Sequence, residues 1–158
     1  MDRYTRITYK GKIQYMWDKK GKYIREDNKF VILEDGDVEI KKELAKILKA
    51  NPYIKNRIKG IKDLNKKLYY AKVWWITESN DLTVLKNHKR RKFRGGFHLD
   101  HIFCIICGYK NNIPPEAIGH IDNLRFIPSK LNMRKRDLIT EETQKIINKI
   151  IVKLNIKQ

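Results

Sequence analysis

The 158-residue chain has no apolar run close to the roughly eighteen residues that a membrane-spanning helix needs, so we expect no membrane partner. Its first ten residues, MDRYTRITYK, have no apolar stretch after their charges, which predicts a cytoplasmic protein that is not secreted. We find no internal repeat and no low-complexity linker. The length therefore indicates one domain, or a small catalytic core with an attached module.

Cysteine is scarce. Cys104 and Cys107 form one C-x-x-C pair within FCIICG, and no second cysteine pair exists. A structural zinc ion usually takes four ligands, which His98, His101 and His120 would have to complete. The apolar neighbours favour buried thiols in a reducing compartment, and zinc stays an alternative.

Acidic residues are also few. The chain has 36 Lys and Arg but only 18 Asp and Glu, which gives a net charge of +18 spread along its whole length. Such a field attracts polyanions, and nucleic acid is the commonest polyanionic partner. The Lys-, Ile- and Asn-rich usage of an AT-rich genome is the other explanation of this composition.

Local patterns predict a β-rich beginning followed by helices. In residues 1–35, turn signals separate short runs of Ile, Tyr and Trp, which is typical of a small antiparallel meander. The apolar period changes to that of a helix over residues 38–50, and again over residues 65–78, where Leu68, Ala71 and Trp75 would face a core. Residues 138–156 predict a last helix capped by Thr140, whose apolar stripe packs on the core or forms a dimer seam.

Residues 97–137 carry the most informative pattern. FHLDHIF predicts a strand, GYKNNIPPEAIG a polar loop with one short helical turn, NLRFIP a second strand, and KLNMRKR a helix capped by Ser129. Potential metal-binding and proton-transferring side chains lie at the end of the first strand. The order strand, loop, strand, helix therefore gathers several polar residues in one place.

The order Asp100-His101, Asn123-Leu124 and Asn132-x-x-Lys135 resembles the HNH (ββα-metal) nucleases. More narrowly, residues 73–137 look like the small homing-type HNH endonucleases of phage genomes, in the variant whose last position is Asn. The resemblance implies an α+β fold with a ββα-metal core. It also implies two parts, a basic β/α module over residues 1–72 that positions DNA and a nuclease domain with a C-terminal helix over residues 73–158.

The resemblance also implies a role for each residue in hydrolysis of DNA. His101 would be the general base, and the carbonyl of Asn123 would orient its ring. Asp100 and Asn132 would hold one divalent cation, and their hard oxygen donors favour Mg²⁺, or Mn²⁺. Lys135, one helical turn beyond Asn132, would contact phosphate or the transition state. The long interval between His101 and Asn123 departs from compact HNH cores.

Basic residues around this pattern are candidates for contacts with the backbone of duplex DNA. The run KNHKRRKFR at residues 86–94 contains no acidic residue. The candidates are Lys89, Arg90, Arg91, Lys92, Arg94, Arg125, Arg134 and Arg136. His98 would share the face of Asp100, where a structural role is favoured and an auxiliary one stays an alternative, and His120 is expected to be structural.

Two alternatives to a homing-type nuclease stay open. One is a non-catalytic, basic RNA- or ribosome-associated protein with a decayed HNH site. The other is a nuclease with a role in restriction or packaging. Either a monomer or a homodimer is compatible with the sequence, since cleavage of both strands needs two sites or two successive nicks.

Overall fold

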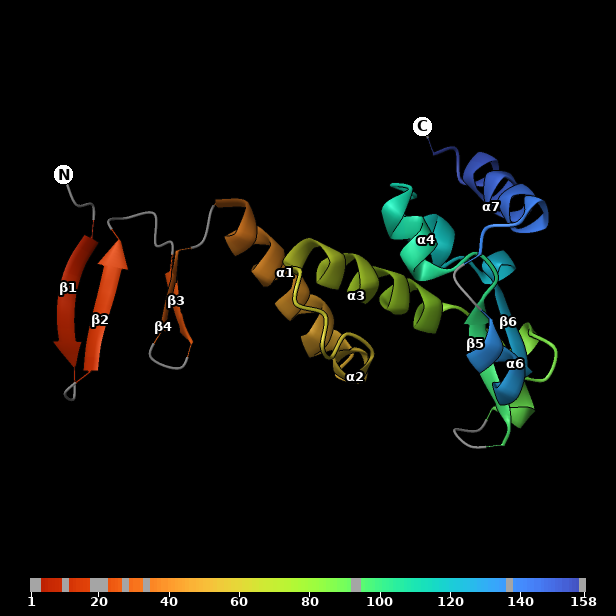
Figure 1. Ribbon diagram of the computed structural model, residues 1–158, viewed down its shortest axis with the longest axis horizontal. Helices are drawn as coiled ribbons and strands as arrows, with labels where there is room; N and C mark the ends of the chain where they lie inside the picture. Colours follow the sequence, from red (N-terminus) through yellow and green to blue (C-terminus); the bar gives the residue numbers. More distant parts are fainter. Residues whose placement is uncertain are drawn as a thin grey trace. The chain divides into compact units, whose positions relative to one another are not determined.

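The computed structural model describes residues 4–9, 12–17, 23–26, 29–32, 35–91, 95–135 and 138–156 (Figure 1). The chain forms two compact units, Met1–Lys46 and Ile47–Gln158. The boundary expected after residue 72 falls inside helix α3 (Leu64–Ser79), which belongs wholly to the second unit. The functional division into a DNA-positioning part and a nuclease part stays a prediction.

The first unit contains the β-rich segment that the turn signals predict. Strands β1 (Tyr4–Tyr9) and β2 (Lys12–Trp17) form one antiparallel hairpin, and β3 (Tyr23–Glu26) and β4 (Lys29–Ile32) form another. They are two separate two-stranded sheets and not one continuous meander. Helix α1 (Asp35–Ala50) follows and confirms the predicted change of period.

The second unit is mainly helical around one apolar core. Helix α3 packs against α2 (Ile54–Arg57), α4 (Ile105–Lys110) and α5 (Pro115–Ile118), and α7 (Glu141–Lys153) packs against α5. The described part of this unit also contains three short 3₁₀ turns: η1 (Leu82–Val84) and η2 (His88–Arg90), which follow α3, and η3 (Ile121–Asn123), which follows α5. The core consists of Val73, Phe103, Cys107, Ile113, Ala117, Ile118, Ile147, Ile150 and Ile151.

Helices α3 and α7 begin at side-chain caps. The Asp63 carboxylate accepts a hydrogen bond from the backbone N–H of Lys66 at 2.6 Å, and Thr140 forms a reciprocal capping box with Thr143. The cap predicted at Thr140 is therefore confirmed, whereas α6 begins at Ser129 itself, with Pro128 in the cap position and no side-chain capping hydrogen bond. Isoleucines on one face of α7 are buried in the core of this unit, so the apolar stripe of the last helix is occupied by packing within the chain.

The inward face of α3 differs by one residue from the prediction. Trp74 is buried, whereas Trp75 is 38% exposed, so the expectation that Trp75 faces the core is wrong. One residue turns a helix by about 100°, so Trp74 and Trp75 point in different directions and cannot both face the same neighbour. Helix α3 packs against the hairpin described below. That contact buries Trp74 and also Thr77, which lies one turn later.

Strands β5 (Phe97–His101) and β6 (Leu124–Pro128) form an antiparallel pair, and helix α6 (Ser129–Arg134) follows β6 directly (Figure 1). Helix α6 packs against both strands. The two predicted strands and the helix that follows them are thus present over residues 97–134, in a fold of the α+β class. Among the residues that the structure describes, no helix is long and apolar enough to span a membrane.

The segment between the two strands is not an open loop, because it contains α4 and α5. Gly108 in α4 permits close packing, since a Cβ atom there would lie 2.5 Å from the Tyr69 hydroxyl and 2.6 Å from Ile118 Cγ1. Cys104 and Cys107 are joined as a disulfide at the start of α4. The expectation of free buried thiols is therefore wrong, and zinc binding through two thiolates is not available in this state.

Candidate active site

The hairpin β5–β6 has two chemically different faces. Successive side chains of a strand point to opposite faces, so His98 and Asp100 share one face and His101 points to the other. In the strand register Asp100 is opposite Arg125, and His101 is opposite Leu124. Leu124 is buried whereas Arg125 is exposed, so Asp100 lies on a polar face and His101 lies on an apolar one.

A buried carboxylate with two cationic partners forms the centre of the polar face. Asp100 is 6% exposed, and its Oδ2 atom accepts a hydrogen bond from Arg125 Nε at 3.0 Å. Lys135 Nζ lies 2.8 Å from Asp100 Oδ1 and 3.1 Å from Oδ2. The same ammonium group donates to the backbone carbonyls of His101 and Ile102. The expected partner of phosphate, Lys135, is thus held by four oxygen atoms of the protein.

Helix α6 brings Asn132 to this face. Its amide Nδ2 lies 3.4 Å from Nδ1 of His98, which is two residues before Asp100 on the same strand and therefore on the same face. Asn132 is half-buried and contacts His98, so the expected Asp100–Asn132 pair shares a face without a direct hydrogen bond between the two side chains.

His101 lies in a closed environment on the apolar face. The ring is 6% exposed, its Nε2 atom lies 2.9 Å from the hydroxyl oxygen of Thr77, and the Trp74 ring meets it edge-on with centroids 5.1 Å apart. Burial, followed by the positive charges of Lys135 and Arg57, lowers the pKa of His101 to about 3. The Arg57 guanidinium lies over the Trp74 ring, 4.3 Å from the ring centroid. The imidazole is therefore neutral near pH 7.

Asn123 is fully buried and binds backbone, not the His101 ring. Its Oδ1 accepts from Phe103 N at 2.7 Å, and its Nδ2 donates to the carbonyls of Phe103 and Ile118 at 3.1 and 2.8 Å. Its backbone carbonyl accepts from Ile102 N at 2.8 Å. Among the described contacts both oxygens of Asn123 accept from the chain that follows His101 and neither from the His101 ring, so the orienting role of Asn123 stays a prediction.

Sequence reasoning missed Thr77, the residue that does contact the His101 ring. The signal was present in the period of α3, since Thr77 lies one turn after Trp74 on the buried face of that helix. It was hidden because a polar residue within an amphipathic helix is usually assigned to the solvent side. Its contact with a residue 24 positions later depends on how α3 packs on the hairpin.

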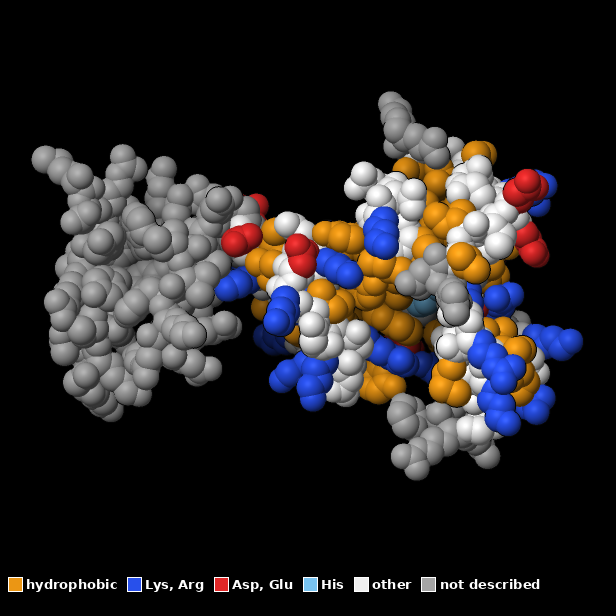
Figure 2. Space-filling model, in the orientation of Figure 1, with side chains coloured by type: hydrophobic (Ala, Val, Ile, Leu, Met, Phe, Trp, Pro, Cys, Tyr) orange, Lys and Arg blue, Asp and Glu red, His pale blue; other side chains and the backbone are white. Residues whose placement is uncertain are grey.

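The basic candidates divide by their surroundings. Lys89 and Arg90 are exposed at η2, where Arg90 stacks on the Phe97 ring at 4.2 Å, and Arg91 pairs with Glu78 at 3.0 Å. Arg134 is exposed on α6. Figure 2 shows Lys and Arg side chains on the surface around α6 and the β5–β6 hairpin. Lys92, Arg94 and Arg136 lie outside the described residues.

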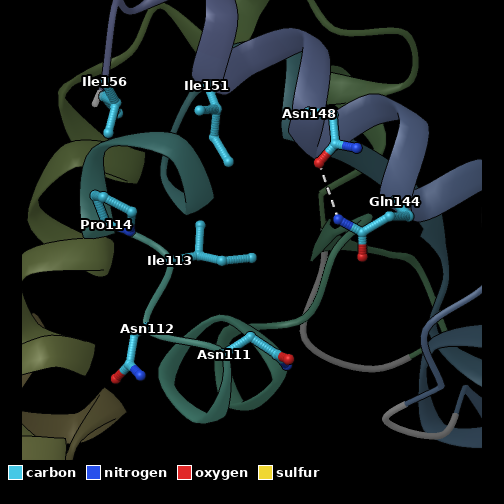
Figure 3. Close-up of a pocket in the computed structure, with 8 residues that line it drawn as sticks. All are labelled: Asn111, Asn112, Ile113, Pro114, Gln144, Asn148, Ile151 and Ile156. Atoms are coloured by element: carbon cyan, nitrogen blue, oxygen red, sulfur yellow. Dashed lines mark hydrogen bonds between the residues drawn. The ribbon is translucent and has the colours of Figure 1, made fainter. Parts of the chain in front are cut away.

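A separate pocket of about 460 Å³ lies between α7 and the segment after α4 (Figure 3). Four amide side chains and four apolar residues line it, and none of the predicted site residues is among them. The lining residues are Asn111, Asn112, Ile113, Pro114, Gln144, Asn148, Ile151 and Ile156. Gln144 Nε2 donates to Asn148 Oδ1 at 2.9 Å across the face of α7.

No family model, no curated protein and no solved structure matches the chain. The chemistry of the site is therefore judged from its own residues. Among the residues that the structure describes, no three His, Cys, Asp or Glu side chains gather to bind a metal ion. The oxygens around Lys135 nevertheless form a set of hard donors, two from Asp100 and two backbone carbonyls, and such donors suit Mg²⁺.

Proposed function

We propose that this protein is a metal-dependent endonuclease of the HNH type that hydrolyses phosphodiester bonds in duplex DNA. The observation that supports it most directly is the cluster on the polar face of the β5–β6 hairpin. Asp100 contacts Lys135 there, and Asn132 shares the face through His98, in the strand–strand–helix order that the resemblance to ββα-metal nucleases predicts. The net charge of +18 supports a polyanionic substrate.

In this proposal His101 accepts the proton of the attacking water, which requires its ring to leave its buried contacts with Thr77 and Trp74 on the face opposite Asp100. The ring is neutral near pH 7, as a general base requires, but the burial that lowers its pKa to about 3 also makes it a weak base in this conformation. Asp100 and Asn132 would hold Mg²⁺, or Mn²⁺. The bound ion would neutralise charge on the phosphate and the leaving oxygen.

Lys135 and the exposed basic residues have different roles in this proposal. Lys135 holds the Asp100 carboxylate in the absence of metal and would move to the phosphate when the ion binds. Arg125, Arg134 and the residues of η2 would bind the DNA backbone through their exposed groups. These contacts carry no sequence information, so they position the duplex without selecting a target.

A basic nucleic-acid-binding protein without catalysis is the second candidate, and one observation favours it. Asp100 is already neutralised by Arg125 and Lys135, and His101 is buried against α3, so every group has a partner without substrate or metal. A structural carboxylate and a structural histidine would look the same. The two candidates differ in whether the chain cleaves DNA.

Cleavage of supercoiled plasmid in the presence of Mg²⁺ tests the proposal, with His101→Ala and Asn132→Ala as variants. We expect His101→Ala to cleave about 10²–10⁴-fold more slowly with DNA binding retained, because it lacks the base. His120→Ala is the matched control, since His120 contacts Asp122 in η3 and not this cluster.

Three outcomes would contradict the proposal in different parts. Binding of DNA without cleavage in any divalent ion favours the second candidate. Undiminished cleavage in EDTA removes the metal. Equal rates for His101→Ala and wild type remove the base. A homing role in phage or mobile elements, as opposed to restriction or packaging, would be judged from the cleaved sequence.

A further inference from the structure

Aromatic rings and cations alternate on one surface of helices α2 and α3. On α3, Lys66, Tyr70 and Trp74 are spaced by four residues and share one face, with Lys66 Nζ 5.8 Å from the Tyr70 ring centroid. At α2, the Arg57 guanidinium lies 5.3 Å from the ring centroid of Tyr53, four residues earlier. The two rows meet where Arg57 lies over Trp74 at 4.3 Å, and we call these residues the α2–α3 aromatic surface.

The chain that forms this surface is strongly basic. Residues 51–77 contain seven Lys or Arg and a single acidic residue, Asp63. The Asp63 carboxylate caps α3 by accepting from the backbone N–H of Lys66. Figure 2 shows basic and hydrophobic side chains mixed over α2 and α3. The charge of this surface is therefore complementary to a polyanion.

Tyr53 and Arg57 are the members of the surface that a ligand can reach most directly. Tyr53 is 55% exposed, whereas Trp74 is 9% exposed beneath Arg57. Within the described ranges no carboxylate forms an ion pair with Arg57, which is itself exposed. An exposed ring beside such a guanidinium offers one ligand both a stacking face and a contact for phosphate.

Stacking distinguishes an unpaired strand of nucleic acid from a duplex. In a duplex the bases are stacked on one another, and a protein reaches their edges and the phosphates. In an unpaired strand the base faces are open, and aromatic side chains along a basic surface bind them with little dependence on sequence. The α2–α3 aromatic surface has both the rings and the cations that this kind of binding uses.

We infer that the α2–α3 aromatic surface binds an unpaired strand of nucleic acid, with a base stacked on Tyr53 and a neighbouring phosphate paired with Arg57. The residues of this site are different from the polar cluster around Asp100. Trp74 joins the surface to the β5–β6 hairpin, because its ring meets His101 edge-on with centroids 5.1 Å apart. The inference goes beyond the proposed function, since a strand can bind here whether or not the chain cleaves DNA.

Fluorescence anisotropy of labelled oligonucleotides, measured with the full chain in EDTA, tests the inference without cleavage. The probes are a thymidine strand of about 20 nucleotides, a uridine strand and a DNA duplex of the same length. We expect Tyr53→Ala to weaken binding of a single strand about 5–100-fold, as the loss of one stacked base does, and to leave duplex binding unchanged. The tighter of the two single strands identifies the sugar that the site prefers.

Two other substitutions at Tyr53 separate stacking from apolar contact. Tyr53→Phe keeps the ring and should bind the single strand as the wild type does. Tyr53→Leu keeps an apolar side chain without a ring and should bind as weakly as Tyr53→Ala. Because Tyr53 is exposed, we expect all three variants to fold, which circular dichroism verifies.

Arg57→Gln tests the phosphate contact. It should lower the slope of log affinity against log salt concentration by about 0.7 for the single strand, the change expected for one lost phosphate contact. Lys149→Gln is the matched control, because it removes the same charge from an exposed lysine on α7 and should leave this slope unchanged.

Several results would overturn the inference. They are a wild type that binds neither single strand, Tyr53→Ala with undiminished single-strand binding, and an equal loss of affinity for strand and duplex. Wild-type affinity of Tyr53→Leu would show apolar contact without stacking, and an unchanged salt slope in Arg57→Gln would remove the phosphate contact. A chain that cleaves no plasmid overturns the proposed nuclease and not this site, because these measurements use binding alone.

Discussion

Replacing Lys135 by methionine tests whether Asp100 is held by a cation that metal can replace. Lys135 Nζ contacts both oxygens of Asp100 and the carbonyls of His101 and Ile102. The side chains of Lys135 and Asp100 are 21% and 7% exposed, so the pair is only partly screened by solvent. Methionine keeps an unbranched side chain of similar length without the charge.

The size of the effect follows from which partner remains. Removing one partner of a buried ion pair costs about 3–5 kcal/mol when the other charge is left alone. Here Arg125 stays 3.0 Å from Asp100 Oδ2, but its side chain is 47% exposed and compensates only in part. We therefore expect Lys135→Met to lower the free energy of unfolding by about 1–3 kcal/mol in EDTA, near neutral pH.

Added Mg²⁺ provides the second half of the test. In the variant the Asp100 carboxylate is free of the ammonium group, so a divalent cation held by Asp100 and Asn132 can bind without displacing a lysine. Binding to the folded state alone raises stability with ligand concentration. We expect excess Mg²⁺ to restore part of the loss in Lys135→Met and to stabilise the wild type less.

Urea denaturation followed by circular dichroism measures all four conditions. Lys130→Met is the matched control, because Lys130 is an exposed lysine of the same helix, α6. Unchanged stability of Lys135→Met in EDTA would refute the ion-pair reasoning. Equal stabilisation of wild type and variant by Mg²⁺ would refute the claim that lysine and metal use the same oxygens.

Two further predictions concern the other side of the hairpin. Because the native ring of His101 has its pKa lowered to about 3 while an unfolded histidine titrates near 6.5, the unfolded state binds the proton first as pH falls. The stability that the neutral ring provides is complete above pH 6.5 and is lost toward pH 3, at up to about 1.4 kcal/mol per pH unit. As pH falls over this range, the urea midpoint of His101→Gln should fall less than that of the wild type, because the variant lacks the titrating ring. Parallel falls in the two proteins would contradict the lowered pKa of His101. Asn123→Ala should lose about 2–4 kcal/mol in urea denaturation without metal or DNA, because it leaves the N–H and carbonyl of Phe103 and the carbonyl of Ile118 without their partner. A stable but inactive Asn123→Ala would instead indicate a role in the reaction.

The sequence was sufficient for the local elements of the candidate site. The alternation in FHLDHIF and NLRFIP predicted the two strands, and the structure pairs them with the expected helix after Pro128. Thr140 at the start of the last helix was predicted from its position before Glu141 and Glu142. These features depend on residues that are neighbours in the chain, which is why a single sequence determines them.

The partners of the site residues were beyond the reach of the sequence. The pattern suggested that Asn123 orients His101, yet the amide of Asn123 binds the backbone of Phe103 and Ile118. Which groups the Asn123 amide binds depends on the path that the chain takes through α4 and α5 between the two strands. Spacing along the sequence does not determine that path.

The sequence by itself determined the strongly basic character, the two strands and the helix of residues 97–134, and which polar residues lie near their ends. Only the tertiary structure decided which face of the hairpin is buried, because that depends on the packing of α3. The same packing selects Trp74 over Trp75 and brings Thr77 to His101. Burial of apolar surface brings segments that are distant in the sequence together, and this packing determines which polar groups come into contact.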